Sequence, residues 1–162
     1  MSTDMVFKLE MTMGLIWMGL VAGWYILPRL HKISIYDALT PPLLIAVLRF
    51  HGMNFLVPEI NNGLSSDFAI PAAYGDFAVC LIALAAAVAC RKRMKIGITF
   101  AWIYAILGAL DFANGFYLGE IHQMPLHLGP TWFMVIYEAP LQITALFVLF
   151  RLLTKHPELK VI

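Results

Sequence analysis

The chain has 162 residues, of which 61% are hydrophobic and only 13% are charged. Soluble domains average about 45–50% apolar and about 25% charged residues, so this composition excludes an ordinary water-soluble domain. The formal net charge of +1 argues against nucleic-acid binding, because such domains concentrate lysine and arginine on one face. We therefore expect the lipid bilayer to be the main partner of the chain.

Five apolar stretches are long enough to cross the hydrocarbon core of a bilayer, which takes about 20 helical residues. Segments rich in proline, glycine and asparagine separate them. The predicted spans are residues 11–30, 38–57, 68–90, 96–119 and 130–153. They predict an all-α fold, a single integral membrane bundle of about five transmembrane helices. No cleavable signal peptide is expected, because the N-terminus carries acidic residues where a signal peptide has a basic region.

The distribution of charge predicts the orientation of this bundle. Lysine and arginine follow the first, third and fifth spans, most densely in residues 91–95, whereas the opposite ends carry mainly aspartate and glutamate. The positive-inside rule then places the N-terminus outside and the C-terminus in the cytoplasm. We expect a multi-pass protein of the cytoplasmic (inner) membrane.

Five ionisable residues fall inside the predicted spans, where each charge costs about 2.5–3.5 kcal/mol or more unless it is paired, neutralised or hydrated. They are Arg49, His51, Asp76, Asp111 and Glu138. The three acids lie roughly 12 Å from the outer ends of their helices, at 1.5 Å per residue. Arg49 and His51 reach a similar depth from the cytoplasmic side. We therefore expect four helices to form one inward-facing polar layer.

Three amide side chains extend this layer, because residues three or four positions apart share a helix face. They are Asn54, Asn114 and Gln142, which follow His51, Asp111 and Glu138 respectively. Arg49 and His51 are about 200° apart around an α-helix and cannot both face the centre. The predicted ligand-binding set is Arg49, His51, Asn54, Asp76, Asp111, Asn114, Glu138 and Gln142.

The layer has more acids than bases, since three carboxyl groups face one arginine. Either His51 is protonated and one acid is neutral, or an external cation completes the layer. A second interpretation is an interhelical network of ion pairs that only fixes the packing of the helices.

The sequence predicts no particular cofactor. One histidine and three carboxylates could ligate a divalent ion, but no two of them have the spacing of a helical metal motif. His122 and His127, in an outer loop, are candidates for a second metal site. Haem of the b type would need two inward histidines, and only His51 lies within a span. Cys80 and Cys90 are ten residues apart on one helix, too far for a disulfide.

Residues 48–93 resemble a pattern of small uncharacterised bacterial membrane proteins. That pattern has an arginine, a glycine three residues later, Phe-Leu, a turn, Phe-Ala, and a Pro-Ala-Gly-x-Gly-Asp-like segment that enters the next helix. The matching residues are Arg49, Gly52, Phe55, Phe68, Ala69, Pro71, Ala72, Gly75 and Asp76. Ala73 replaces a usual glycine, and His51 lies outside the pattern. The resemblance implies a bacterial cytoplasmic-membrane protein in which Arg49 faces Asp76, and it implies no activity.

Three functions fit these observations. The first is the binding or passage of a small cation, a proton, or a polar or lipophilic molecule through the buried layer. The second is an intramembrane enzyme acting on a lipophilic substrate, with His51 and Asp111 as the candidate catalytic acid–base pair. The third is an accessory subunit whose lipid-facing surface contacts another membrane subunit or a second copy of the chain. We favour the first.

Overall fold

Serine side chains begin three of the long helical segments. The Oγ atoms of Ser2, Ser34 and Ser65 each accept a backbone N–H from the first turn that follows, at 3.2–3.3 Å. Such caps satisfy backbone donors that have no partner within the helix. Aspartate occupies the first turn of each of these segments, where the positive end of the helix dipole stabilises it.

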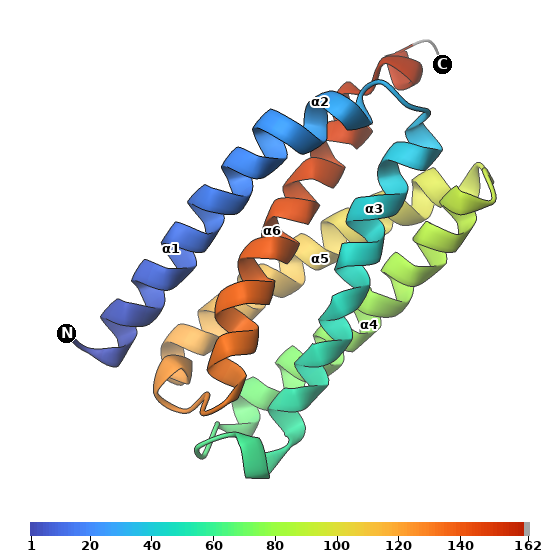
Figure 1. Ribbon diagram of the computed structural model, residues 1–162. Coiled ribbons are helices and arrows are strands. Elements are labelled where there is room, and N and C mark those ends of the chain that lie inside the picture. The colour runs from blue at the N-terminus through green and yellow to red at the C-terminus, as the bar shows by residue number, and fades with distance from the viewer. Residues whose placement is uncertain (161–162) are drawn as a thin grey trace.

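The computed structural model describes residues 1–160, and these residues form helices and short connections without a strand (Figure 1). Five helical rods run along the molecule. Three short 3₁₀ turns lie beyond the ends of these rods. The rods are α1 (Thr3–Val21) with the π-helical turn η1 (Ala22–Ile26) and α2 (Leu27–Leu30), α3 (Ile35–Val47) with η2 (Leu48–Leu56), α4 (Ser66–Arg91), α5 (Ile96–Ile121) and α6 (Thr131–Lys155). The short turns are η3 (Pro58–Ile60), η4 (Met124–Leu126) and η5 (Pro157–Lys160).

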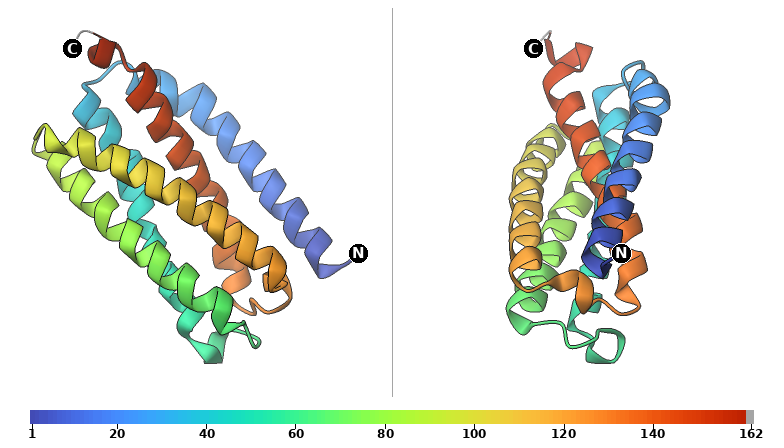
Figure 2. Two further views of the ribbon diagram at one scale, coloured as in Figure 1. Left: turned by 180° about the vertical axis from the view of Figure 1, so that it is seen from behind. Right: turned by 90° about the vertical axis from the view of Figure 1, so that its left-hand side faces the viewer.

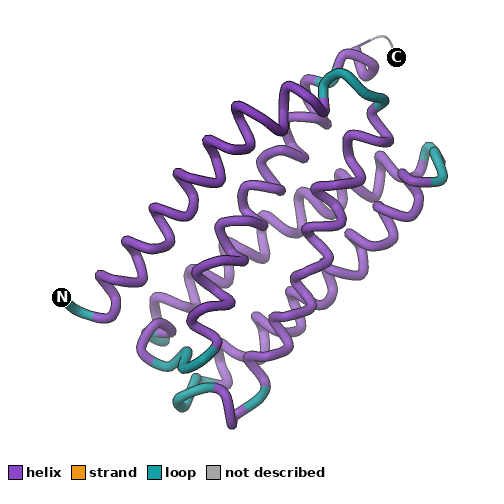
Figure 3. The backbone as a smooth tube through the Cα atoms, viewed as in Figure 1, coloured by secondary structure: helices purple, strands orange, loops and turns teal. Residues whose placement is uncertain are grey.

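Successive rods run in opposite directions, so the connections gather at the two ends of the bundle (Figure 3). The N-terminus therefore lies at one end and the last turn of α6 at the other (Figure 1). α6 packs against α1 and α3, and α4 packs against α3, η2 and α5. Figure 2 shows α5 on the opposite face of the bundle from α3, and the two rods meet in the interior.

Four of the helices are long and apolar enough to cross a membrane: Thr3–Leu30, Ser66–Arg91, Ile96–Ile121 and Thr131–Lys155. The predicted second span, residues 38–57, corresponds to α3 and η2, which change from α-helical to 3₁₀ geometry at Leu48. The all-α prediction is confirmed. Many large apolar side chains are exposed on the outside of the bundle, among them Trp17, Trp24, Leu110 and Phe133.

Apolar packing is divided into two clusters along the bundle. The larger lies toward the end that carries the α4–α5 connection and packs alanines of α4 against leucines such as Leu39, Leu43 and Leu149. The smaller lies toward the other end and contains Phe55 and Phe68. The polar layer lies between the two clusters, so it is enclosed by apolar packing from both sides.

The 3₁₀ rod η2 is stabilised at its end by a residue from the following loop. The Asn61 amide Nδ2 donates to the backbone carbonyls of Asn54, Phe55 and Val57 at 3.0–3.1 Å. The Thr131 hydroxyl donates to Asn61 Oδ1 at 3.0 Å, which links the loop to the start of α6. Asn61 thus supplies partners for carbonyls that the end of a helix leaves free.

Candidate functional site

Arg49 is the centre of an ionic cluster inside the bundle. Its side chain is only 2% exposed, and its Nε donates to Asp76 Oδ1 at 2.7 Å. Nη2 donates to Asp111 Oδ2, and Nη1 donates to the Gly108 carbonyl at 3.3 Å. The guanidinium carbon also lies 4.0 Å from the centroid of the Phe112 ring, a cation–π contact. Arg49 of η2 is therefore held by both α4 and α5.

Two glycines allow the helices to come close enough for these contacts. A Cβ atom added at Gly52 would collide with the side chain of Asp76, and one added at Gly75 would collide with the side chain of Asp111. Small residues at such positions let neighbouring helices approach closely. Gly52 therefore positions η2 against α4, and Gly75 positions α4 against α5.

A second ionisable pair lies on another side of η2. His51 Nδ1 is 2.8 Å from Glu138 Oε1 of α6, and the two side chains are 34% and 24% exposed. In a 3₁₀-helix two residues two positions apart are about 240° apart around the axis. His51 consequently faces α6, whereas Arg49 faces α4 and α5.

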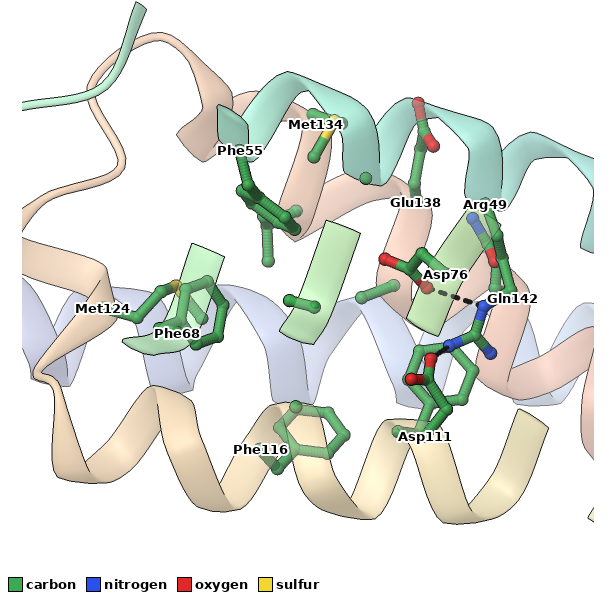
Figure 4. A pocket seen from close by; sticks show the side chains of 16 residues that line it. Arg49, Phe55, Phe68, Asp76, Asp111, Phe116, Met124, Met134, Glu138 and Gln142 are labelled. Atoms are coloured by element: carbon green, nitrogen blue, oxygen red, sulfur yellow. Dashed lines mark hydrogen bonds and ion pairs between the residues drawn. The ribbon is translucent and has the colours of Figure 1, made fainter. Parts of the chain in front are cut away.

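A cavity of about 100 Å³ lies beside the cluster, among η2, α4, α5 and α6 (Figure 4). Its polar end is lined by Arg49, Asp76, Asp111, Glu138 and Gln142. Aromatic and methionine side chains line the other end, which lies toward the η2–α4 connection and the α5–α6 loop (Figure 4). The apolar lining includes Phe55, Phe68, Phe116, Met124 and Met134.

Three buried polar atoms have no hydrogen-bond partner among the described residues: Glu138 Oε2, Gln142 Oε1 and the Tyr104 hydroxyl oxygen. Gln142 is only 5% exposed and lies one helical turn after Glu138. A buried acceptor without a donor costs about 1–3 kcal/mol. The first two atoms are acceptors on one face of α6, in side chains that line the cavity, and each lacks a donor.

The structure brings five of the eight predicted site residues to the cavity wall: Arg49, Asp76, Asp111, Glu138 and Gln142. His51 contacts Glu138 without lining the cavity. Asn54 donates to Met134 Sδ at 3.6 Å, so it supports a cavity residue indirectly. Asn114 is exposed and does not line the cavity, because its position on α5 turns it away from the bundle.

The sequence analysis did not single out Phe112, although it lies beneath the Arg49 guanidinium. Its position directly after Asp111 on a predicted span is the only sequence signal for that contact. The outer-loop candidates are His122 and His127, and His127 Nδ1 is 2.9 Å from the backbone carbonyl of Asn62. Within residues 1–160 no three histidine, cysteine, aspartate or glutamate side chains are arranged to hold a metal ion.

The fold and the cluster together define an all-α protein with helices suited to a membrane and with a buried arginine held by two aspartates. The chain belongs to the family described as Domain of unknown function (DUF8737), which matches residues 6–154 and so includes the whole cluster. Searches of curated proteins and of solved structures found no match to this chain.

Proposed function

We propose that this is a five-span membrane protein that binds a small, positively charged hydrogen-bond donor in the cavity of its polar layer. The single observation that carries the proposal is the pair of buried, unpartnered acceptors, Glu138 Oε2 and Gln142 Oε1, at a cavity wall that also has two aspartates. The proposed orientation has the N-terminus outside and the C-terminus in the cytoplasm.

Exposure and charge support the membrane part of the proposal. Large apolar side chains cover the outside of the rods, and lipid is the solvent in which such a surface is stable. The α3–η2 rod runs alongside α4 for most of its length, so a membrane crossed by α4 would also enclose this rod (Figure 1). The basic α4–α5 connection, residues 91–95, supports its placement in the cytoplasm.

The charges at the cavity support a positively charged ligand. Asp76, Asp111 and Glu138 face only one permanent cation, Arg49, and protonation of His51 would still leave one carboxylate without a compensating charge. Uncompensated charge is costly in a low-dielectric interior. A proton or a bound cation would remove that cost, and an ammonium group would also donate to Glu138 Oε2.

The geometry favours an ammonium-type ligand over a divalent metal ion, because two of the carboxylates are already bound to Arg49 and the described residues form no metal-ligating group of three. The acid–base alternative draws no support from the contacts. His51 pairs with Glu138, and its predicted catalytic partner Asp111 pairs with Arg49.

The test is isothermal titration calorimetry of the purified protein with ethylammonium chloride at pH 7.5. We expect saturable binding that is at least about tenfold weaker in Glu138→Gln, which removes the charge and keeps the shape of the side chain. Glu59→Gln is the matched control, because Glu59 is exposed and outside the cavity.

If Glu138→Gln does not fold, Gln142→Met supplies the same test, since it removes the second acceptor at nearly constant volume. We expect severalfold weaker binding in this variant. The absence of ethylammonium binding in the unmodified protein, or equal binding in both cavity variants, would overturn the proposal.

A further inference from the structure

We infer that the ligand is an amphiphile, with an ammonium head at the acids and an apolar tail that reaches the cavity sideways through a groove between α1 and α5. This inference rests on the proposed function and adds the chemical class of the ligand and its route.

The cavity changes character along the bundle axis. Its deep end holds the carboxylates and Gln142, and the side chains toward the outer end are aromatic rings and methionines (Figure 4). A hydrated inorganic ion would lose its water without replacement at that apolar end. A molecule with one charged end and one apolar end would match both parts of the wall.

A second hollow, of about 210 Å³, lies between α1 and α5. It shares Phe116 and Met124 with the cavity, so the two spaces are neighbours across these two side chains. On the α1 side its apolar lining is Phe7, Met11 and Leu15, and the polar residues Asp4, Lys8 and Thr12 complete that side. The groove is therefore apolar over most of its length and leads toward the cavity.

The outer end of this groove is bridged by a surface ion pair. Lys8 Nζ of α1 lies 3.3 Å from Glu120 Oε1 of α5, and the same amine lies 3.0 Å from Asp4. These charged groups mark the outer rim, and the apolar part of the groove lies deeper, at the level that lipid chains would occupy. A tail in the groove would thus remain in an apolar environment while the head reaches the acids.

Gly115 is a position at which a substitution can test the apolar part of the cavity. It lies one turn after Asp111 on α5 and lines the cavity, and an added Cβ would meet no atom within 4 Å. The first atom of a leucine side chain at this position therefore meets no neighbour, and the rest of the side chain would take space that the tail needs. Gly19 of α1 is the matched control, because it is exposed, also meets nothing within 4 Å, and lines neither space.

The experiment measures binding of the n-alkylammonium series from ethyl to hexyl to the protein in lipid nanodiscs, with empty nanodiscs as the correction for partitioning. We expect about fourfold tighter binding for each added methylene that is buried. Gly115→Leu should lose the gain in affinity with chain length, because its side chain takes the place of the tail. Gly19→Leu should behave like the unmodified protein.

The outcomes separate the two proposals. Ethylammonium binding without any dependence on chain length, or an unchanged series in Gly115→Leu, would overturn the amphiphile and leave the cation site standing. Failure of every amine to bind would overturn both. Hexanoate is the test of charge, since binding of this anion at the affinity of hexylammonium would also overturn both.

Discussion

Arg49 holds the ionic cluster together, and its removal would leave two partly buried carboxylates without their partner. Breaking a buried ion pair from one side costs about 3–5 kcal/mol. We expect Arg49→Gln to lower the free energy of unfolding by about 3 kcal/mol, measured by thermal or denaturant unfolding in detergent. Arg91→Gln is the control, since the Arg91 side chain is 79% exposed. A loss below about 1 kcal/mol in Arg49→Gln would contradict the cluster.

Two helical glycines give opposite predictions for the same substitution. Glycine in a helix interior is less stable than alanine by about 1 kcal/mol, so Gly115→Ala should stabilise the protein where open space receives the new atom. Gly75→Ala should destabilise it, because the new atom collides with Asp111. Unfolding temperatures of the two variants provide the comparison, and stabilisation by both would contradict the close approach of α4 and α5.

The residues of the site were predictable to different degrees. Ionisable groups at matched depths indicated an inward-facing layer, and the resemblance paired Arg49 with Asp76, which hydrogen-bond in the structure. The pairing of His51 with Glu138 was not predictable, because it depends on the direction in which η2 turns its side chains. The exposure of Asn114 was also not predictable. Asn114 lies three positions after Asp111, so its side chain is rotated by about 60° around α5 from that of Asp111.

Among the elements, the 3₁₀ segment η2 depends on a residue that follows it in the chain. Asn61→Ala would leave the carbonyls of Asn54, Phe55 and Val57 without the amide that now donates to them. We expect a loss of about 1–3 kcal/mol in the free energy of unfolding. Asn62→Ala changes an exposed side chain next to it and should have little effect. Equal stability of the two variants would show that Asn61 does not hold η2.

The sequence predicted the existence of this rod and placed it at residues 38–57, but it did not predict the change to 3₁₀ geometry at Leu48. A run of apolar residues predicts a membrane-spanning helix without distinguishing the two helix types. The change depends on contacts from far along the chain, since Thr131 positions Asn61 and Asp76 of α4 holds Arg49.

At the scale of the whole molecule, the end that carries the C-terminal turn contains a pair of stacked histidines. His31 stacks on His156 with ring centroids 5.8 Å apart, and buried His156 contacts the Ile33 carbonyl through Nε2 at 3.1 Å. Burial, and then the positive charges of His156 and Arg151, lower the pKa of His31 from its usual value of 6.5. The folded protein therefore prefers neutral His31.

Because the pKa of His31 is lower in the folded state, its contribution to stability is complete above pH 6.5 and is lost as the pH falls toward the folded-state pKa. We expect the unfolding temperature to fall between pH 7.5 and pH 5.5, and His31→Gln, which has no titrating group, to reduce this fall. The measurement is a thermal unfolding series of both proteins in the same buffers. An identical pH dependence would exclude His31 as the source.

The 3₁₀ geometry of η2 also determines how far its rod reaches. α3 and η2 together contain 22 residues, fewer than the 26 of α4 or the 25 of α6. A 3₁₀-helix rises about 2.0 Å per residue and an α-helix about 1.5 Å, so this rod is roughly 37 Å long, the same as α6. As a continuous α-helix it would be roughly 33 Å long. The stretched segment thus lets a shorter stretch of sequence match the height of its neighbours, and it adds that height at the level where Arg49 meets the two aspartates.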